Sequence, residues 1–212
     1  MIKHIIFDWD GTLVNTVRFL KISFEETFSR FNITNITYQY IRETCAANPD
    51  KNIFELVFEP EIREEAKQYF YAFMRENHLK YISKRRGAEE ILAFCRNNNI
   101  KCYIQSAKDR EILRREIEFC GWTDYFVRIC GSGDYVTNKN EATACTGLFC
   151  GQIPPAGEML VLGDGASDVE MARTLGCPVI IIKSYGRYVG RQPDYKLRSL
   201  KDFVPLLQTM LY

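Results

Sequence analysis

Phe7-Asp8-Trp9-Asp10-Gly11-Thr12 follows directly on the apolar run His4-Ile5-Ile6, near the start of this 212-residue chain. The pattern predicts a buried strand that ends in a glycine turn. Two carboxylates held two positions apart at such a turn repel each other unless a cation lies between them or one of them holds a proton. A hard cation such as Mg²⁺ binds a few carboxylate oxygens and keeps positions open for phosphate oxygens. The stretch therefore indicates a functional site.

Composition and charge bound the class of protein. The chain is 46% hydrophobic, enough for one large domain or for one domain with an insertion. Its net charge of +1 gives no global field toward nucleic acid or an anionic membrane. No secretory leader and no run of about 20 apolar residues is present. We expect a soluble cytoplasmic protein that binds neither nucleic acid nor membrane.

The cysteine pattern agrees with that location. Eight cysteines are scattered along the chain, several of them inside apolar runs, and no Cys-x-x-Cys occurs. Such usage is typical of reduced thiols acting as small hydrophobic residues, and not of a disulfide framework or a zinc site. The chain has only two histidines, which further weakens a transition-metal interpretation.

Short apolar runs alternate with longer amphipathic segments over most of the chain. This alternation predicts an α/β fold, with a Rossmann-like parallel sheet and helices on both of its faces. Gly176, with Pro178 just beyond it, predicts where the last of these helices ends. Strands are expected at residues 3–7, 101–105, 126–130, 158–162 and 178–182, and helices at 88–97, 109–119 and 167–175.

Residues 16–83 interrupt the alternation. They have little strand character, and apolar side chains recur at helical spacing in two stripes. We interpret this stretch as an inserted helical cap, and residues 1–15 and 84–212 as the core. Most of its aromatic side chains are expected to pack the small helices together, although a few could line a pocket. The stripes are Val17, Leu20, Phe24, Phe28 and Phe31, and then Ile62, Ala66, Tyr69 or Phe70, and Phe73.

Polar groups follow four of the expected strands. In an open parallel sheet, ligands bind at the carboxyl ends of the strands, so these groups are expected to meet there. A later run of glycine, tyrosine and arginine at residues 185–191 is expected to be a loop near the same edge. The polar groups are Asp8 and Asp10, then Ser106, Ala107 and Lys108, then Lys139, and finally Asp164 to Asp168.

This ordered set resembles the four motifs of the haloacid dehalogenase-like hydrolase superfamily. Asp8-Trp9-Asp10-Gly11-Thr12, Ser106, Lys139 and the Asp164–Asp168 segment stand in the order of that family. The position of the cap, between the first motif and Ser106, is similar to the branch of phosphoglycolate phosphatases and β-phosphoglucomutases. One departure is Asn140, where the family typically has proline after the lysine.

The resemblance implies a role for each carboxylate of the first motif. Asp8 is the expected nucleophile, forming an aspartyl-phosphate. Asp10 is the expected general acid and base. An aspartate at this second position is found in the phosphatases and mutases of the superfamily and is absent from its dehalogenases. Asp10 therefore favours phosphoryl transfer. Without the other motifs, each residue could equally be a turn carboxylate.

Further residues are expected to bind phosphate and metal. Thr12, Ser106, Ala107 and Lys139 are the expected phosphate-binding residues, with Lys139 neutralising charge. Lys108 is a rival for that role, and spacing favours Lys139. The expected ligands of a Mg²⁺ cofactor are Asp8, Asp164 and the backbone carbonyl of Asp10. Asp168 is expected to act on the metal indirectly, through water or by orienting Lys139.

The sequence thus predicts a Mg²⁺-dependent phosphatase that hydrolyses a small phosphomonoester through an aspartyl-phosphate. Two alternatives stay open. A phosphosugar mutase would use the same first half-reaction and return the phosphoryl group to a second hydroxyl. A non-catalytic binding protein would keep the fold alone, and the complete set of catalytic residues argues against it. The expected partner is a small phosphorylated metabolite, and either a monomer or a homodimer is expected.

Overall fold

The computed structural model describes residues 1–47, 53–136, 138–182 and 192–211. The chain divides into two compact units. Met1–Asn15 and Ser83–Tyr212 form the first, called here the core unit, and Thr16–Ile82 form the second, the helical unit. Residues 185–191, which the sequence predicts to be a loop, lie outside the described residues. A cap over residues 16–83 was expected from the sequence, and the division between the units assigns Ser83 to the core unit.

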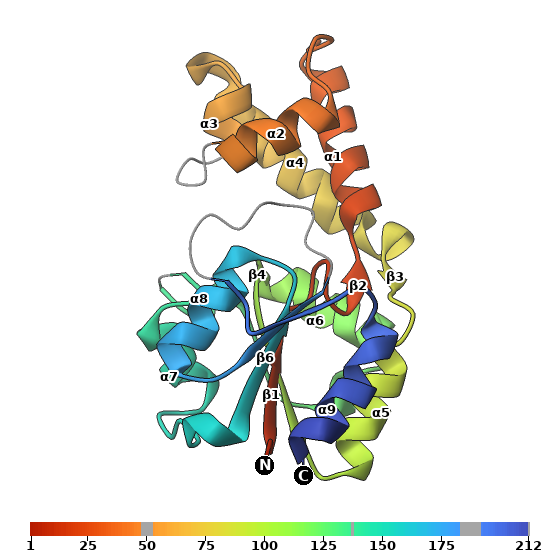
Figure 1. Cartoon of the computed structure of the whole chain (residues 1–212). Helices are drawn as coiled ribbons and strands as arrows, with labels where there is room; N and C mark the ends of the chain where they lie inside the picture. Colours follow the sequence, from red (N-terminus) through yellow and green to blue (C-terminus); the bar gives the residue numbers. More distant parts are fainter. Residues whose placement is uncertain (48–52, 137, 183–191, 212) are drawn as a thin grey trace. The chain divides into compact units, whose positions relative to one another are not determined.

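The core unit is built on a six-stranded sheet of the described residues, and all of its strands run parallel. The strands lie in the order β5-β4-β1-β6-β7-β8 (Figure 1). From β1, the chain adds β4 and β5 on one side and then β6, β7 and β8 on the other, so the direction in which strands are added reverses at β1. Ligands bind at such a switch point in open α/β sheets. The strands are β1 His4–Phe7, β4 Lys101–Asp109, β5 Phe126–Ser132, β6 Met159–Gly163, β7 Val179–Ile182 and β8 Tyr195–Leu197.

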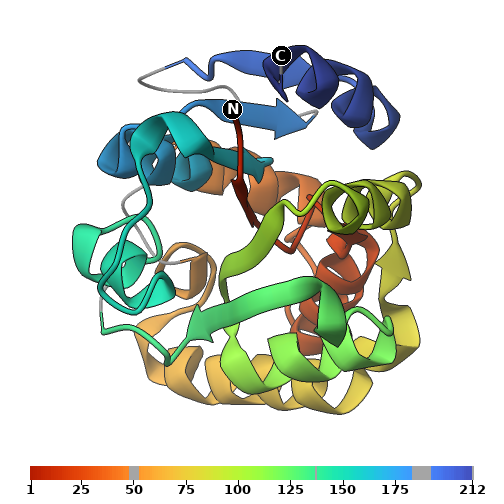
Figure 2. The ribbon, with the colours of Figure 1, turned by 90° about the horizontal axis from the view of Figure 1, so that it is seen from below.

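Helices cover both faces of this sheet. Figure 2 views it nearly along its strands, with α7 and α8 at one face and α5, α6 and α9 at the other. The α/β fold class expected from the sequence is therefore confirmed. The helices of the core unit are α5 Ala88–Asn97, α6 Arg110–Phe119, α7 Ala142–Leu148, α8 Ala166–Leu175 and α9 Phe203–Leu211, with short 3₁₀ turns η1 Thr123–Tyr125, η2 Ala156–Glu158 and η3 Leu200–Asp202.

The predicted strands and helices all occur, within a few residues of their expected ends. Helix α8 ends at Gly176, which takes the left-handed conformation (φ 67°) as the sequence predicts. Strand β8 and helices α7 and α9 were not expected from the sequence. Strand β8 has three residues and lacks an apolar run, α7 contains two threonines and a glycine, and α9 carries Pro205. Each therefore lacks the local signal that marks its class.

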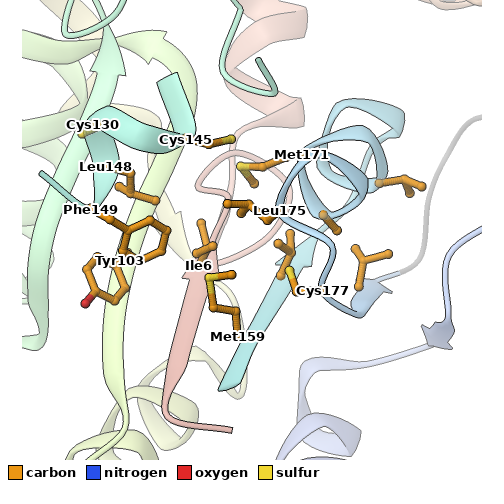
Figure 3. Close-up of a cluster of buried hydrophobic side chains, with 14 of the residues drawn as sticks. Ile6, Tyr103, Cys130, Cys145, Leu148, Phe149, Met159, Met171, Leu175 and Cys177 are labelled. Atoms are coloured by element: carbon orange, nitrogen blue, oxygen red, sulfur yellow. The ribbon is translucent and has the colours of Figure 1, made fainter. Parts of the chain in front are cut away.

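Alternate side chains along the strands pack on opposite faces of the sheet. Ile6 is paired with Tyr103 on one side and with Val161 on the other, and all three belong to a single buried cluster. This cluster also takes side chains from α7 and α8, including Leu148, Met171 and Leu175 (Figure 3). The core therefore holds the carboxyl end of β1 between β6, which is fully buried, and the stretch of β4 that is buried from Cys102 to Ser106.

The helical unit has its own aromatic core. Its helices are α1 Val17–Arg30, α2 Tyr38–Ala47, α3 Ile53–Val57 and α4 Pro60–Tyr81. Phe24 from α1, Phe54 from α3 and Phe70 from α4 are buried together, with the Phe24 and Phe70 ring centroids 4.6 Å apart. Within this unit, the aromatic residues thus pack the helices together, as expected. Val17, at the start of the first predicted stripe, is exposed instead.

A two-stranded ribbon carries the chain out of the core unit and back. Strand β2, Val14–Asn15, pairs antiparallel with β3, Ser83–Lys84.

Seven cysteines among the described residues are free thiols, and all of these except Cys150 are buried. This supports the expected use of cysteine as a small hydrophobic residue. Among the described residues, no helix is both long and apolar enough to cross a membrane.

Helix α6 begins at a side-chain cap that can be tested. The Asp109 carboxylate accepts hydrogen bonds from the backbone N–H groups of Glu111 and Ile112. We expect Asp109→Ala to lower the free energy of unfolding of the core unit by about 1 kcal/mol, because two N–H groups lose their acceptor. Urea unfolding followed by tryptophan fluorescence measures this, since Trp9 and Trp122 are both buried in the core unit. Asp109→Asn keeps an acceptor and is the control. An equal loss in both variants would contradict the capping role.

Candidate active site

The turn after β1 places Asp8 at the switch point of the sheet. The backbone N–H of Asp8 donates to Leu162 O on β6 at 2.9 Å, which extends the pairing of the two strands by one residue. Gly11 then takes a left-handed conformation (φ 74°), and a Cβ atom there would overlap the carboxylate of Asp164. Glycine is therefore required at this position both for the turn and for the approach of Asp164.

Lys139 lies between two of the predicted carboxylates. Its Nζ donates to Oδ1 of Asp8 and to Oδ1 of Asp168, at 2.7 Å each, and its side chain is 6% exposed. Gln105 of β4 holds the backbone of the same residue, donating from Nε2 to Lys139 O at 3.0 Å. Burial opposes the charged amine, but the Asp168 and Asp8 carboxylates outweigh it and raise the pKa of Lys139 above its ordinary value.

Asp168 uses both of its carboxylate oxygens within the site. Oδ1 accepts from Lys139, and Oδ2 accepts from the backbone N–H groups of Asp164 and Gly165, at 3.1 and 3.0 Å. The residue lies in the first turn of α8, where a carboxylate is also favoured by the helix dipole. This arrangement fits the predicted role of orienting Lys139, and it also holds the turn that carries Asp164.

Three carboxylates crowd this end of the sheet. Ligand oxygens of Asp8, Asp164 and Asp168 lie within 4.8 Å of one another. Burial raises the pKa of Asp8 well above its usual range, and the charges of Asp168 and Asp164 add to this while Lys139 opposes it. Burial and the charge of Asp168 raise the pKa of Asp164 to about 6. Lys139 and Arg85 lower the pKa of Asp164 but do not outweigh the burial and the neighbouring carboxylate that raise it. Hard oxygen donors in this arrangement fit Mg²⁺.

The predicted phosphate-binding residues lie beside Asp8. The Thr12 hydroxyl is buried and donates to Asp8 Oδ2 at 3.4 Å. Ser106 follows Ile104, the β4 partner of Phe7, by two residues, so it lies at the same edge of the sheet as Asp8. Its Oγ accepts from the backbone N–H of Lys108 at 3.3 Å, and Ala107 between them is exposed. Contact of these groups with phosphate stays a prediction.

Asp10 lies in a second group of charges that the sequence analysis missed. Lys108 Nζ is 2.8 Å from Asp10 Oδ1 and donates to Glu116 Oε2 at 2.7 Å. The two lysines thus serve different carboxylates, Lys139 at Asp8 and Lys108 at Asp10. A signal for Glu116 was present in the sequence. It is placed three and four positions after Leu113 and Ile112, so a carboxylate lies in the apolar stripe of its helix.

The parallel sheet, the inserted helices and this ordered site define a hydrolase family. The family model of haloacid dehalogenase-like hydrolases matches residues 5–182. The chain therefore belongs to this family and is a hydrolase, in the branch that resembles phosphoglycolate phosphatases.

Curated relatives match the chain over nearly its whole length. A phosphoglycolate phosphatase of Photobacterium profundum is 25% identical over 221 residues, which cover 98% of this chain and 96% of the relative. The pyrophosphatase PpaX of Halalkalibacterium halodurans is 24% identical over 213 residues, which cover 97% of each protein. The relatives thus carry two different names for phosphate-releasing enzymes.

Solved structures show the same fold. A haloacid dehalogenase-like hydrolase from Streptococcus pneumoniae has a TM-score of 0.81 at 19% identity, and the match covers 98% of this chain and 99% of that one. CbbY from Rhodobacter sphaeroides, solved in complex with phosphate, has a TM-score of 0.72 at 20% identity, with 96% of each chain covered. At these identities the likeness concerns the fold.

Gly163 provides a test of how tightly the site is packed. A Cβ atom at this position would overlap the Asp168 carboxylate. We expect Gly163→Ala to lower the free energy of unfolding by about 1–3 kcal/mol, because either the strand or Asp168 must move. Gly157→Ala is the matched control, since a Cβ atom there meets nothing within 4 Å. Urea unfolding of both variants measures the difference, and equal stability would show that Asp168 can move without cost.

Proposed function

We propose that this protein is a Mg²⁺-dependent phosphatase that hydrolyses a small phosphomonoester through an aspartyl-phosphate. The observation that carries the proposal is the position of Lys139, which bridges Asp8 and Asp168 at 2.7 Å beside the carboxylate of Asp164. A buried ammonium at this place would stabilise the negative charge of a transferring phosphoryl group. Membership of the hydrolase family supports an enzyme over the non-catalytic alternative.

Asp8 is the proposed nucleophile. One of its oxygens attacks phosphorus, the bond from phosphorus to the leaving oxygen breaks, and the phosphoryl group becomes attached to the Asp8 carboxylate. The hydrogen bond from its backbone N–H to β6 fixes the carboxylate at the edge of the sheet. Asp168 in turn orients Lys139, because its second oxygen is bound to two backbone N–H groups of the neighbouring turn.

Asp10 is the proposed general acid and base. In the first step it gives a proton to the leaving oxygen, and in the second it takes a proton from the water that attacks the aspartyl-phosphate. Its side chain is 35% exposed, whereas that of Asp8 is 7% exposed. The more accessible of the two carboxylates is thus the one that exchanges protons with the leaving group and with water.

Mg²⁺ would be held by Asp8, Asp164 and the backbone carbonyl of Asp10. When bound, it supplies positive charge that offsets both the crowded carboxylates and the phosphate oxygens. Asp168 is not a direct ligand of the metal in this proposal and orients Lys139. Thr12, Ser106, Ala107 and Lys139 bind the phosphate in this proposal.

The helical unit is proposed to act as a cap, with residues 16–83 as cap and residues 1–15 and 84–212 as core. Closure of such a cap would exclude bulk water during phosphoryl transfer. The substrate is proposed to be a small phosphorylated metabolite in the cytoplasm. Pyrophosphate is a second candidate, because several similar relatives are named pyrophosphatase PpaX.

Removal of the nucleophile tests the reaction. We expect the wild-type protein to release phosphate from several phosphomonoesters with Mg²⁺ and not with EDTA. Asp8→Asn should lower kcat/KM by about a thousand-fold or more, because the amide is a poor nucleophile. Asp124→Asn, an exposed aspartate in η1, is the control. An Asp8→Asn enzyme of full activity would overturn the proposal.

The identity of the acceptor is tested in the same assay. A panel of phosphoglycolate, sugar phosphates, nucleoside monophosphates and pyrophosphate, followed by ³¹P NMR, separates the candidates. Inorganic phosphate as the product supports hydrolysis. An isomerised sugar phosphate would instead support a phosphosugar mutase.

Crowding of the carboxylates predicts a pH-dependent effect of Mg²⁺ on stability. The pKa of Asp164 is raised from 3.8 to about 6, so its protonated form stabilises the metal-free fold below pH 3.8, and that contribution is lost as the pH rises through 6. The raised pKa of Asp8 extends the loss to higher pH. Mg²⁺ replaces the protons, so we expect it to raise Tm more at about pH 8 than at about pH 5.

Thermal unfolding in MgCl₂ and in EDTA, at both pH values, measures this effect. Asp164→Asn removes one ligand and one charge. We expect this variant to unfold at a higher temperature than the wild type in EDTA at the higher pH, and to gain little from Mg²⁺. An equal gain in wild type and variant would show that the metal binds elsewhere.

A further inference from the structure

A completely buried carboxylate contacts the turn that carries Asp8 and Asp10. Glu116 of α6 is 0% exposed. Its Oε2 accepts two hydrogen bonds, from Trp9 Nε1 at 2.6 Å and from Lys108 Nζ at 2.7 Å. A buried carboxylate is costly unless it is paired and hydrogen-bonded, and here both conditions hold. Glu116 therefore connects the residue between Asp8 and Asp10 with a lysine of β4.

The same lysine extends this connection to Asp10. The Lys108 side chain is 6% exposed, and its Nζ lies 2.8 Å from Asp10 Oδ1. Lys108 stands where the pairing of β4 with β5 shifts register, between Gln105 and Asp109. Such irregularities redirect side chains, and this one places the lysine between α6 and the turn after β1. With two carboxylates on its ammonium, Lys108 has little freedom to move.

The contact leaves the two oxygens of Asp10 in different surroundings. Oδ1 is buried and accepts no hydrogen bond from the described residues, so its contact with Lys108 Nζ is an ion pair, and the Asp10 side chain as a whole is 35% exposed. The exposure therefore comes from the rest of the side chain, which includes Oδ2. A carboxyl group anchored through one oxygen presents the other in a defined direction, and proton transfer requires such alignment.

We propose that Lys108, held in place by Glu116, is a positioning residue that orients Asp10 for proton transfer. The inference rests on the proposed phosphatase function. In the first step a bond forms between Asp8 and phosphorus, the bond from phosphorus to the leaving oxygen breaks, and the proton on Asp10 Oδ2 moves to that oxygen. Lys108 takes no part in the bond changes. It keeps Oδ1 fixed, so that Oδ2 points at the leaving oxygen.

A purely structural role would not require the contact with Asp10. Glu116 is already paired with Lys108 and hydrogen-bonded to Trp9, and these contacts alone satisfy the buried charges. Replacing a buried ion pair by neutral side chains is often neutral or stabilising. Stability therefore does not explain why the ammonium also reaches a partly exposed carboxylate. Orientation of the acid does explain it.

Dependence on the leaving group provides the test. Propyl phosphate needs a proton on its departing oxygen, whereas 4-nitrophenolate departs readily without one. We expect Lys108→Met to lower kcat/KM for propyl phosphate about 10- to 100-fold, within the range that general acid catalysis supplies, and for 4-nitrophenyl phosphate by less than about 3-fold. Lys101→Met, an exposed lysine of the same strand, should change neither value. Equal losses on both substrates would overturn the proposal.

Two further variants separate positioning from folding. Lys108→Met alone removes the ammonium from beside the buried Glu116 carboxylate, whereas Lys108→Met with Glu116→Gln removes that buried negative charge as well, and glutamine can still accept from Trp9. We expect both to show the same selective loss. Recovery of activity on propyl phosphate in the double variant would show that the buried charge of Glu116 caused the defect, and would refute the positioning role.

The last comparison asks whether Lys108 acts through Asp10. In an Asp10→Asn background, Lys108→Met should have no further effect on kcat/KM for propyl phosphate, because the group that it orients is gone. Independent, multiplicative losses would contradict the proposal. If the wild-type enzyme with Mg²⁺ hydrolyses neither ester, the proposed phosphatase function itself fails, which is distinct from an active enzyme whose Lys108 variants lack selectivity.

Discussion

Crowding of negative charge at the carboxyl end of β1 is the constraint on which the rest of the site depends. Asp8, Asp164 and Asp168 bring ligand oxygens within 4.8 Å of one another, in surroundings that are largely closed to water. One ammonium, that of Lys139, lies between two of them. The fold tolerates this arrangement because burial on both faces of the sheet holds the strands in place, and because the remaining charge can be met by protons or by a cation.

The two buried lysines of the site each form ion pairs with a different set of carboxylates. Lys139 contacts Asp8 and Asp168, and Lys108 contacts Asp10 and Glu116. Each ammonium is thus shared between one aspartate of the first motif and one carboxylate from a helix that follows a neighbouring strand. Asp8 and Asp10 are two residues apart in sequence, yet they face different cations. This separation gives the pair a physical basis for acting as nucleophile and as acid and base in the proposed reaction.

Much of the fold could be predicted because the signals are local. Short apolar runs marked five of the strands, and Gly176 marked the end of α8. The ordered polar residues after the strands pointed to one edge of the sheet, where the structure places them. Strand β8 and helices α7 and α9 were missed because their sequences carry threonine, glycine or proline, or lack an apolar run. Packing against the finished sheet stabilises them, and propensity does not.

The sequence by itself determined the family and the α/β fold class, and its motifs, each a few residues long, named in advance the charged residues Asp8, Lys139, Asp164 and Asp168 that the structure brings together. Only the tertiary structure decided what Lys108 does. The spacing of the motifs favoured Lys139 as the lysine that neutralises charge at Asp8, but nothing in the sequence showed that Lys108 reaches Asp10 and Glu116. Asp168 in α8 is 29 positions from Lys139, and Glu116 in α6 is 8 positions from Lys108, so each pair meets only when a helix packs against the sheet. Such pairings depend on the register of parallel strands and on the helices packed against them, so they exist only once the sheet has formed.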